Sequence, residues 1–149
     1  MIRITLILIA AFLGACATYH DTSSQRLPAL PQHYSQFDVQ MGWETRPIGE
    51  HTVVDGVVKN VRYAYMYDLE VWVAVLDSKG KELARSVSFI IPQQLYLNQT
   101  APFSVKLPVS APSGTRLRFT YEYLGSDGGD NHLGGGGARW VQSFQAVVP

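Results

Sequence analysis

The sequence predicts an all-β protein, an antiparallel β-sandwich of about seven strands, although the pattern alone leaves a small β-barrel open. Short runs rich in Val, Tyr, Phe, Trp and Thr recur along the chain and are bounded by Gly, Pro, Asn or Asp. No stretch has the periodicity and caps of a helix of three turns. The 149 residues are 46% hydrophobic and 16% charged, which suits one globular domain.

Seven runs have the length and composition of strands. In chain order they cover residues 37–43, 52–59, 69–77, 82–91, 101–107, 116–124 and 139–148.

Alternation of apolar side chains is clearest in the third and sixth of these runs. The alternating residues are Leu69, Val71, Val73 and Val75, and then Leu117, Phe119, Tyr121 and Tyr123. Because successive side chains point to opposite faces of a strand, each row lies on one face. We predict that these two rows form the core.

Turn residues mark the strand boundaries. Residues 77–80 read Asp-Ser-Lys-Gly, with Asp at the first and Gly at the last position of a tight turn, so they are expected to close a hairpin. Pro92, Pro108 and Pro112 lack the N–H that a strand ladder needs, and they therefore mark strand ends.

The first residues are typical of an export signal. Arg3 supplies a positive charge, and residues 4–13 carry no charged side chain. A run of about 10 residues is too short to span roughly 30 Å of hydrocarbon, so we exclude it from the fold.

This run leads into a motif that resembles the lipobox of bacterial lipoproteins, Leu13-Gly14-Ala15-Cys16. The chain has no other Cys. The resemblance implies that residues 1–15 are a removed signal peptide and that lipid on Cys16 anchors the protein durably to a membrane. Ala17 and Thr18 after the Cys imply the outer membrane of a Gram-negative cell envelope, facing the periplasm. An ordinary signal peptide with a chance Cys is the alternative.

Residues 16–36 are expected to be the lipidated Cys and a flexible tether. They are polar and contain Pro, and they show no apolar period of 2.0 or 3.6. We interpret His20 and His33 as solvated tether residues rather than metal ligands. The folded domain is therefore expected over residues 37–149.

Parts of this domain resemble the FxLYD-type Ig-like domains of bacterial lipoproteins and envelope proteins. The matching residues are Val54, Gly56, Val58, Asn60, Val71, Val73, Val75, Leu76, Asp77, Gly80, Phe103, Val105 and Leu107. The resemblance implies an Ig-like sandwich without established enzymatic activity. The sequence departs from the motif that names the family at Val73, Val75 and Leu76, and it keeps Asp77. A single Cys excludes the intrachain disulfide of antibody domains.

The charge pattern argues against nucleic acid as a partner. Twelve Lys and Arg balance twelve Asp and Glu without a basic cluster. Nucleic-acid binders group several basic side chains to neutralise phosphates.

Motifs of catalysis and metal binding are scarce. The chain has no Gly-x-Ser-x-Gly, and His51 and His132 are isolated histidines, so no His-x-His or His-Glu-x-x-His metal pattern exists. Asp68 and Glu70 would share one strand face, which is more typical of a solvated pair than of an acid–base couple. We expect no enzymatic activity, no cofactor and no metal site.

Glycine dominates residues 125–137, between the last two predicted strands. Asp127, Asp130 and Asn131 could offer oxygen ligands to Ca²⁺, but their spacing fails the EF-hand pattern. We expect a flexible hairpin loop, with a metal site or ordering on a protein partner as alternatives.

Trp72 and Trp140 are the candidate binding residues. Trp72 lies on the face of its strand opposite to Val71, beside Ala74 and Leu76. An exposed apolar stripe there would indicate a protein or glycan surface. The alternative, which we favour, is that a neighbouring element covers the stripe.

Together these observations predict a lipid-anchored envelope lipoprotein whose Ig-like domain acts in protein–protein contact or envelope assembly. A glycan-binding or small-molecule-binding lipoprotein is the alternative. An exposed aromatic face without a deep polar pocket would favour the first function, and a concave pocket lined by Trp and Tyr would favour the second.

Overall fold

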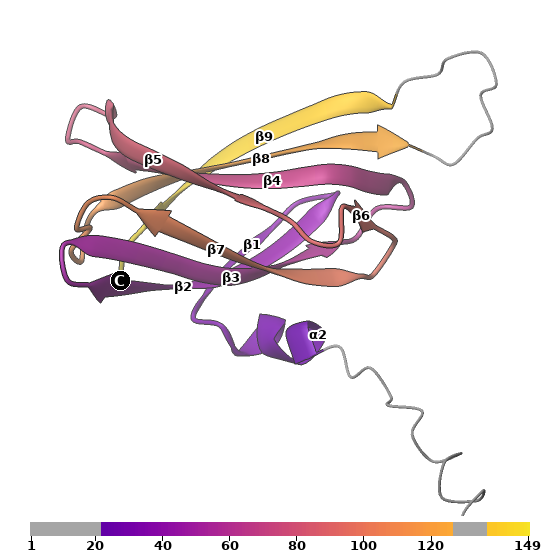
Figure 1. Ribbon diagram of the computed structural model, residues 1–149, viewed down its shortest axis with the longest axis horizontal. Coiled ribbons are helices and arrows are strands. Elements are labelled where there is room, and N and C mark those ends of the chain that lie inside the picture. Colours follow the sequence, from indigo (N-terminus) through magenta and orange to yellow (C-terminus); the bar gives the residue numbers. More distant parts are fainter. Residues whose placement is uncertain (1–21, 127–136) are drawn as a thin grey trace, which may run out of the picture.

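The computed structural model describes residues 22–126 and 137–149, which form two sheets packed face to face (Figure 1). A short helix α2 (Thr22–Arg26) and a 3-10 helix η1 (Leu27–Ala29) come first. The strands that follow are β1 (Gln32–Ser35), β2 (Val39–Ile48), β3 (His51–Asn60), β4 (Tyr65–Leu76), β5 (Glu82–Phe89), β6 (Gln94–Leu95), β7 (Thr100–Leu107), β8 (Arg116–Ser126) and β9 (Ala138–Val147).

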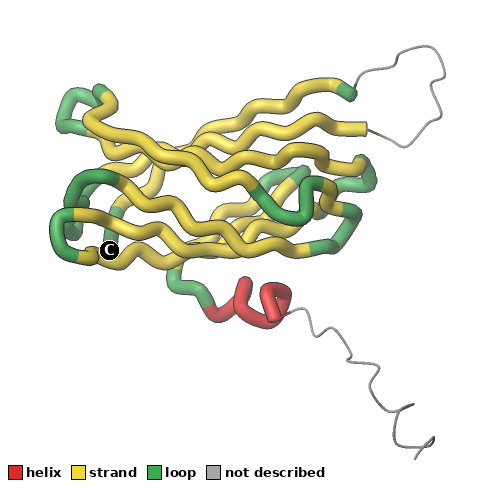
Figure 2. The backbone as a smooth tube through the Cα atoms, viewed as in Figure 1, coloured by secondary structure: helices red, strands yellow, loops and turns green. Residues whose placement is uncertain are grey.

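The strands are divided between a four-stranded and a five-stranded sheet. The first has the order β1-β2-β3-β7, and the second has the order β5-β4-β8-β9 with β6 beside β4. All pairings are antiparallel. The described residues form two layers and no closed barrel, with loops gathered at the two ends (Figure 2). The predicted Ig-like β-sandwich is therefore confirmed, and the barrel alternative is excluded.

The two predicted rows form the core of the five-stranded layer. Every member of both rows is at most 3% exposed. The four-stranded layer contributes the inward-facing side chains of β2, β3 and β7, among them Val39, Met41, Trp43, Val54, Phe103 and Val105. The ring centroids of Trp43 and Phe119 lie 4.7 Å apart, so aromatic contact joins the two sheets.

The hairpin predicted at residues 77–80 closes β4 onto β5. The Gly80 amide donates to the Asp77 carbonyl at 3.1 Å, and Gly80 has a φ of +82°. The Asp77 carboxylate accepts from the amides of Lys79 and Lys81. This local hydrogen bonding explains why Asp and Gly are needed at the two ends of the turn.

All seven predicted strands are present, but three differ clearly in extent. Strand β2 begins two residues later than expected and continues to Ile48, and β5 ends at Phe89. Strand β4 begins at Tyr65 rather than at residue 69 because its first residues pair with the short strand β6.

Residues 22–36 differ from the expected flexible tether. Strand β1 pairs with β2 from Gln32 to Ser35, so the sandwich begins before residue 37. Helix η1 lies over Gly42, where an added Cβ would come within 2.9 Å of the Leu27 carbonyl oxygen. These elements have three to five residues each, too few for a hydrophobic period to show in the sequence. No helix in the ranges 22–126 and 137–149 is long and apolar enough to cross a membrane.

Candidate functional site

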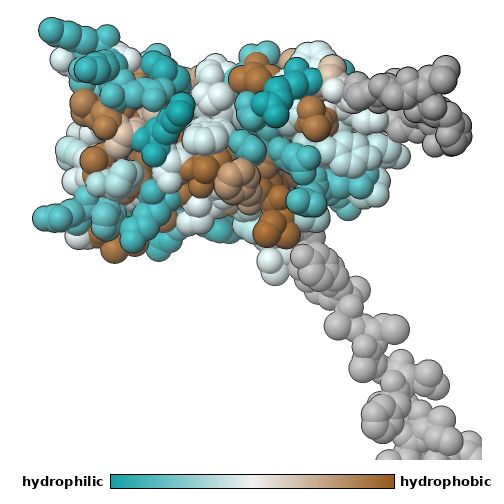
Figure 3. All heavy atoms as spheres, turned by 45° about the horizontal axis from the view of Figure 1, so that its top comes forward, coloured by the Kyte–Doolittle hydropathy of each residue, from teal (hydrophilic) through white to brown (hydrophobic). Residues whose placement is uncertain are grey.

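The candidate site is the outer face of the five-stranded sheet, to which β5, β4, β8 and β9 contribute. Two neighbouring rows cross its centre. One row contains Val87, Trp72, Thr120 and Ser143, and the other contains Phe89, Glu70, Glu122 and Val141. Apolar side chains on this face are therefore interspersed with carboxylates and hydroxyls, and Figure 3 shows such alternation of hydrophobic and hydrophilic patches on the surface.

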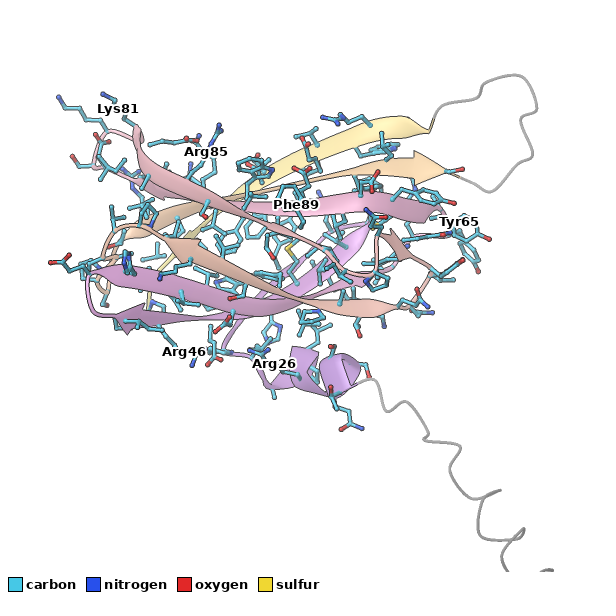
Figure 4. All side chains as sticks on the ribbon, in the orientation of Figure 1. Arg26, Arg46, Tyr65, Lys81, Arg85 and Phe89 are labelled. Carbon is cyan, nitrogen blue, oxygen red and sulfur yellow. The ribbon has the colours of Figure 1, made fainter. Side chains whose placement is uncertain are left out.

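Trp72 is half-buried and held in a fixed orientation. Its indole N–H donates to the Glu70 carboxylate at 2.9 Å, which satisfies the one polar group of the ring. The Arg85 guanidinium lies 5.0 Å from the ring centroid, within the range of a cation–π contact. Phe89, on the same strand as Arg85, is 66% exposed (Figure 4). The aromatic side chains are thus flanked by charges of both signs.

The apolar stripe expected beside Trp72 is not exposed. Ala74 and Leu76 are buried, although they lie on the same side of β4 as Trp72. Arg118 lies beside Ala74 and Glu82 lies beside Leu76, and the two charged side chains form an ion pair at 3.1 Å across this part of the sheet. Their aliphatic stems shield apolar surface while the charged ends reach water. The expected stripe is therefore reduced to the region around Trp72, Val87 and Phe89.

A hollow of about 300 Å³ adjoins Phe89 on this face. It lies where the register between β4 and β8 shifts between Tyr67 and Glu70, a β-bulge that leaves Asp68 at a φ of 50°. Its walls include Asp68, Glu70, Glu122 and Arg139. The bulge thus places both carboxylates of the predicted solvated pair at one hollow, with Asp68 exposed and Glu70 half-buried.

Trp72 borders a second, smaller hollow of about 220 Å³. Ala74, Glu82, Arg85 and Arg118 line it with Trp72. One aromatic side chain and several charged ones form this wall, so it is not the pocket lined by Trp and Tyr that the ligand-binding alternative predicts.

The structure does not bring Trp140 together with Trp72. Trp140 lies across from Tyr123, on the face of the sheet that packs against the core. The Arg62 guanidinium lies 4.3 Å from its ring centroid, and Phe37 makes an edge contact with it at 6.0 Å. Trp140 thus lies on the inner face of the sheet and is partly buried, so its predicted contribution to a binding surface is not on the same face as that of Trp72.

Sequence reasoning missed the buried Asp38. Its carboxylate accepts hydrogen bonds from the hydroxyls of Tyr121 at 2.8 Å and Tyr123 at 2.9 Å. Burial, together with Asp38, raises the pKa of Tyr121 above its usual value. The pKa of Tyr123 rises to about 12, chiefly through burial, with Arg62 acting in the opposite direction. The two tyrosines in a predicted core row could have indicated such a residue, because buried hydroxyls need a hydrogen-bond partner.

A further groove of about 550 Å³ lies between α2 and the outer face of the four-stranded sheet. Leu27, Pro28, His33, Gln40 and Lys59 are among its lining residues. His33 therefore belongs to the folded domain and not to a solvated tether. In the described ranges, no group of three or more His, Cys, Asp or Glu side chains is placed to hold a metal ion.

Several predicted site residues lie outside the described residues. They are Cys16 with its lipobox, His20, and the loop residues Asp127, Asp130, Asn131 and His132.

A comparison with protein families finds no match, and a comparison with curated proteins finds none either. Two solved structures share the architecture. The GAE domain of GGA2p from Saccharomyces cerevisiae has 10% identity and a TM-score of 0.48, and the match covers 79% of this chain and 96% of that one. The GAE domain of yeast GGA1 has 8% identity and a TM-score of 0.50, and the match covers 78% and 96% of the two chains. At such low identity, the likeness to the GGA1 domain supports the sandwich fold alone.

Proposed function

We propose that this protein is a lipid-anchored lipoprotein of the bacterial cell envelope, held by lipid on Cys16 at the periplasmic face of the outer membrane. Its Ig-like domain is non-catalytic and acts in protein–protein contact or envelope assembly. The motif Leu13-Gly14-Ala15-Cys16 supports the anchor. The outer face of the five-stranded sheet supports the contact function.

The observation that carries the contact function is the arrangement around Trp72. Val87, Trp72 and Phe89 form an apolar centre, and Glu70, Arg85 and Glu122 surround it. Protein interfaces commonly have an aromatic centre with a polar rim, and aromatic anchors contribute much of their binding energy. Trp72 is already oriented by Glu70 and Arg85, so little side-chain entropy would be lost on binding.

The position of the N-terminal segment agrees with this use of the face. Helix α2 lies beside the outer side of the four-stranded sheet, in the opposite layer from Trp72 (Figure 1). Figure 4 shows Arg26 on that side and Phe89 on the other layer. An anchor before α2 would therefore leave the face around Trp72 free for a partner.

The hollow at the β-bulge favours a second candidate, binding of a glycan. Asp68, Glu70 and Arg139 could hydrogen-bond sugar hydroxyls while Phe89 contacts a sugar ring. We rank it second because Trp72 does not line this hollow.

Site-specific photo-crosslinking in intact cells tests the contact function. A benzophenone amino acid at Phe89 should form an adduct with a distinct envelope protein. The same group at Ile48, an exposed residue of the other layer, is the matched control. Adding Trp72→Ala should abolish the adduct while the domain still melts cooperatively.

Two outcomes would overturn the proposal of protein contact. One is equal labelling from both positions, or none from Phe89. The other is retention of the purified protein on isolated envelope glycan that is lost in Glu70→Gln, without any protein adduct, which would establish the second candidate.

A further inference from the structure

Besides the two-residue β6, four described strands pair on one side only, and their free backbone groups could recruit another strand. Three of these edges are protected. Strand β1 has four residues, and β7 carries Pro102 and Lys106. Strand β5 carries Arg85, and the Ser88 hydroxyl accepts from the Ser104 amide of β7 at 3.3 Å. The edges of β5 and β7 therefore lie against each other.

Strand β9 lacks these protections except at Val147, whose carbonyl lies beside Gln32 of β1. It has 10 residues without proline, and its register with β8 runs from one end to the other without a shift. Its one charged residue, Arg139, pairs with Glu122 of the same chain at 3.2 Å. A long, nearly uncharged edge without a bulge is the kind that adds a further strand.

Hydrogen bonds at the end of β9 fix which of its residues face the open edge. The Val148 amide donates to the Thr115 carbonyl, and the Val148 carbonyl accepts from the Gly114 amide, so Val148 faces β8. Because direction alternates along a strand, the odd-numbered residues of β9 face outward. The Val147 carbonyl already accepts from the Gln32 side chain at 2.8 Å. The outward-facing residues that remain are Arg139, Val141, Ser143 and Gln145.

We propose that β9 pairs with β9 of a second copy of this chain, so that two five-stranded sheets join into one. The four available residues are symmetric about Gln142. A two-fold axis there places Arg139 of one copy opposite Gln145 of the other, and Val141 opposite Ser143. Each of these pairings supplies two hydrogen bonds. The outward backbone N–H and C=O groups of all four residues are then hydrogen-bonded. Closed two-fold dimers are also the commonest assemblies.

Self-pairing suits this edge for two further reasons. Like charges are not brought opposite each other, because Arg139 meets Gln145, and the 51% exposed Val141 gains a neighbour. A two-fold axis perpendicular to the joined sheet also keeps both four-stranded layers, and both α2 helices, on the same side. Two chains anchored in one membrane need this arrangement, although the pairing itself does not depend on the anchor.

Disulfide trapping tests the register. Two copies of Gln142 would form a pair whose Cα atoms lie about 4.5 Å apart, within the range of roughly 4.4–6.8 Å that a disulfide spans. Full-length Gln142→Cys in oxidised envelopes should therefore run as a covalent dimer on a non-reducing gel. Gln145→Cys is the matched control, because two copies would lie about 20 Å apart along the strands. The unsubstituted chain reports any dimer formed through Cys16.

A proline variant tests the edge itself. Val141→Pro removes an outward N–H but leaves the β8 ladder intact. In detergent, purified full-length protein should sediment as a dimer, and Val141→Pro should sediment as a monomer that still melts cooperatively. Val141→Thr, which keeps the N–H, should remain dimeric.

Three results would overturn the proposal. They are a monomeric unsubstituted protein, equal trapping at positions 142 and 145, and trapping of Gln142→Cys on a different protein instead of on itself. None of them bears on the adduct from Phe89, so the proposed contact function and the β9 pairing can fail separately.

Discussion

The Asp38 carboxylate accepts a hydrogen bond from the Tyr121 hydroxyl at 2.8 Å, across 83 positions of the sequence and between the two layers of the sandwich. Tyr123 donates to its second oxygen. Asp38 is 0% exposed, so water cannot hydrogen-bond to its carboxylate. The two tyrosine hydroxyls and the carboxylate therefore satisfy one another's hydrogen bonds. This cluster joins the beginning of β2 to β8 and stabilises the contact between the two sheets.

We expect Asp38→Ala to lower the free energy of unfolding by roughly 2–5 kcal/mol, because two buried hydroxyls lose their acceptor. Urea unfolding of the purified protein measures this loss. Tyr63→Phe is the control, because Tyr63 is exposed and its change should cost no more than about 0.5 kcal/mol. Similar losses in the two variants would show that the cluster does not stabilise the fold.

Stability should fall as the pH rises from about 10 to about 12. The pKa of Tyr123 is about 12 in the folded protein, and that of an unfolded tyrosine is about 10. Across this interval the unfolded chain loses the Tyr123 proton first, so the stabilisation present below pH 10 is lost as the pH approaches 12. In Tyr123→Phe, the free energy of unfolding should depend less steeply on pH. An unchanged slope would contradict the assigned shift.

The sequence predicts the strands that have a clear alternating pattern. It does not predict the elements and side-chain directions that depend on tertiary contacts alone. The row of Val71 and Val73 is apolar on one side only, so its buried face could be identified in advance. In β9, both Trp140 and Val141 are apolar, and the pattern could not tell which of them faces inward. Strand β1 is too short to show any period.

Of the candidate site, the sequence identifies Trp72 and its face but not the residues that hold it. Glu70 lies two positions away, where alternation predicts the same face. Arg85 comes from β5, and its approach to Trp72 depends on the register between the strands. Asp38 appears in the sequence as an ordinary residue at a strand start, because its partners are more than 80 positions distant.

Gly56→Ala should destabilise the four-stranded sheet. An added Cβ would overlap the Phe103 ring and lie 2.5 Å from the Gly42 carbonyl oxygen, which is backbone and cannot move aside easily. We expect a loss of about 1–3 kcal/mol, typical of overpacking, measured as a lower midpoint of urea unfolding. Lys106→Ala, an exposed position on β7, is the control. If both variants unfold at the midpoint of the unsubstituted protein, Phe103 and Gly42 do not constrain this position.

Cys16 should be the site of lipid attachment. Radiolabelled palmitate should enter the unsubstituted protein and should not enter Cys16→Ser, because no other Cys is present. The Cys16→Ser variant should also no longer partition into the detergent phase when detergent and water separate. Gly14→Ala keeps a small residue in the motif and should still be labelled. Equal labelling with and without Cys16 would contradict the proposed anchor.

The connection between β8 and β9 should tolerate replacement of residues 126–137 by Asn-Gly. The last paired residues are Gly125 and Ala138, and because even-numbered residues of β9 face β8, they form a hydrogen-bonded pair. A two-residue loop closes on such a pair, and Asn-Gly favours the turn that matches the twist of a hairpin. A shorter loop costs less entropy to close, by about 0.6 kcal/mol for each halving of its length.

We therefore expect the shortened protein to melt at the same temperature as the full chain or higher, and to keep its strand signal in circular dichroism. Glycine loses more backbone entropy on ordering than other residues, so the run at residues 134–137 opposes a preformed site. Millimolar Ca²⁺ should then leave the melting temperature of the full chain unchanged. A rise of several degrees that Asp127→Ala with Asp130→Ala abolishes would instead establish a metal site, because a ligand bound only to the folded state raises its stability.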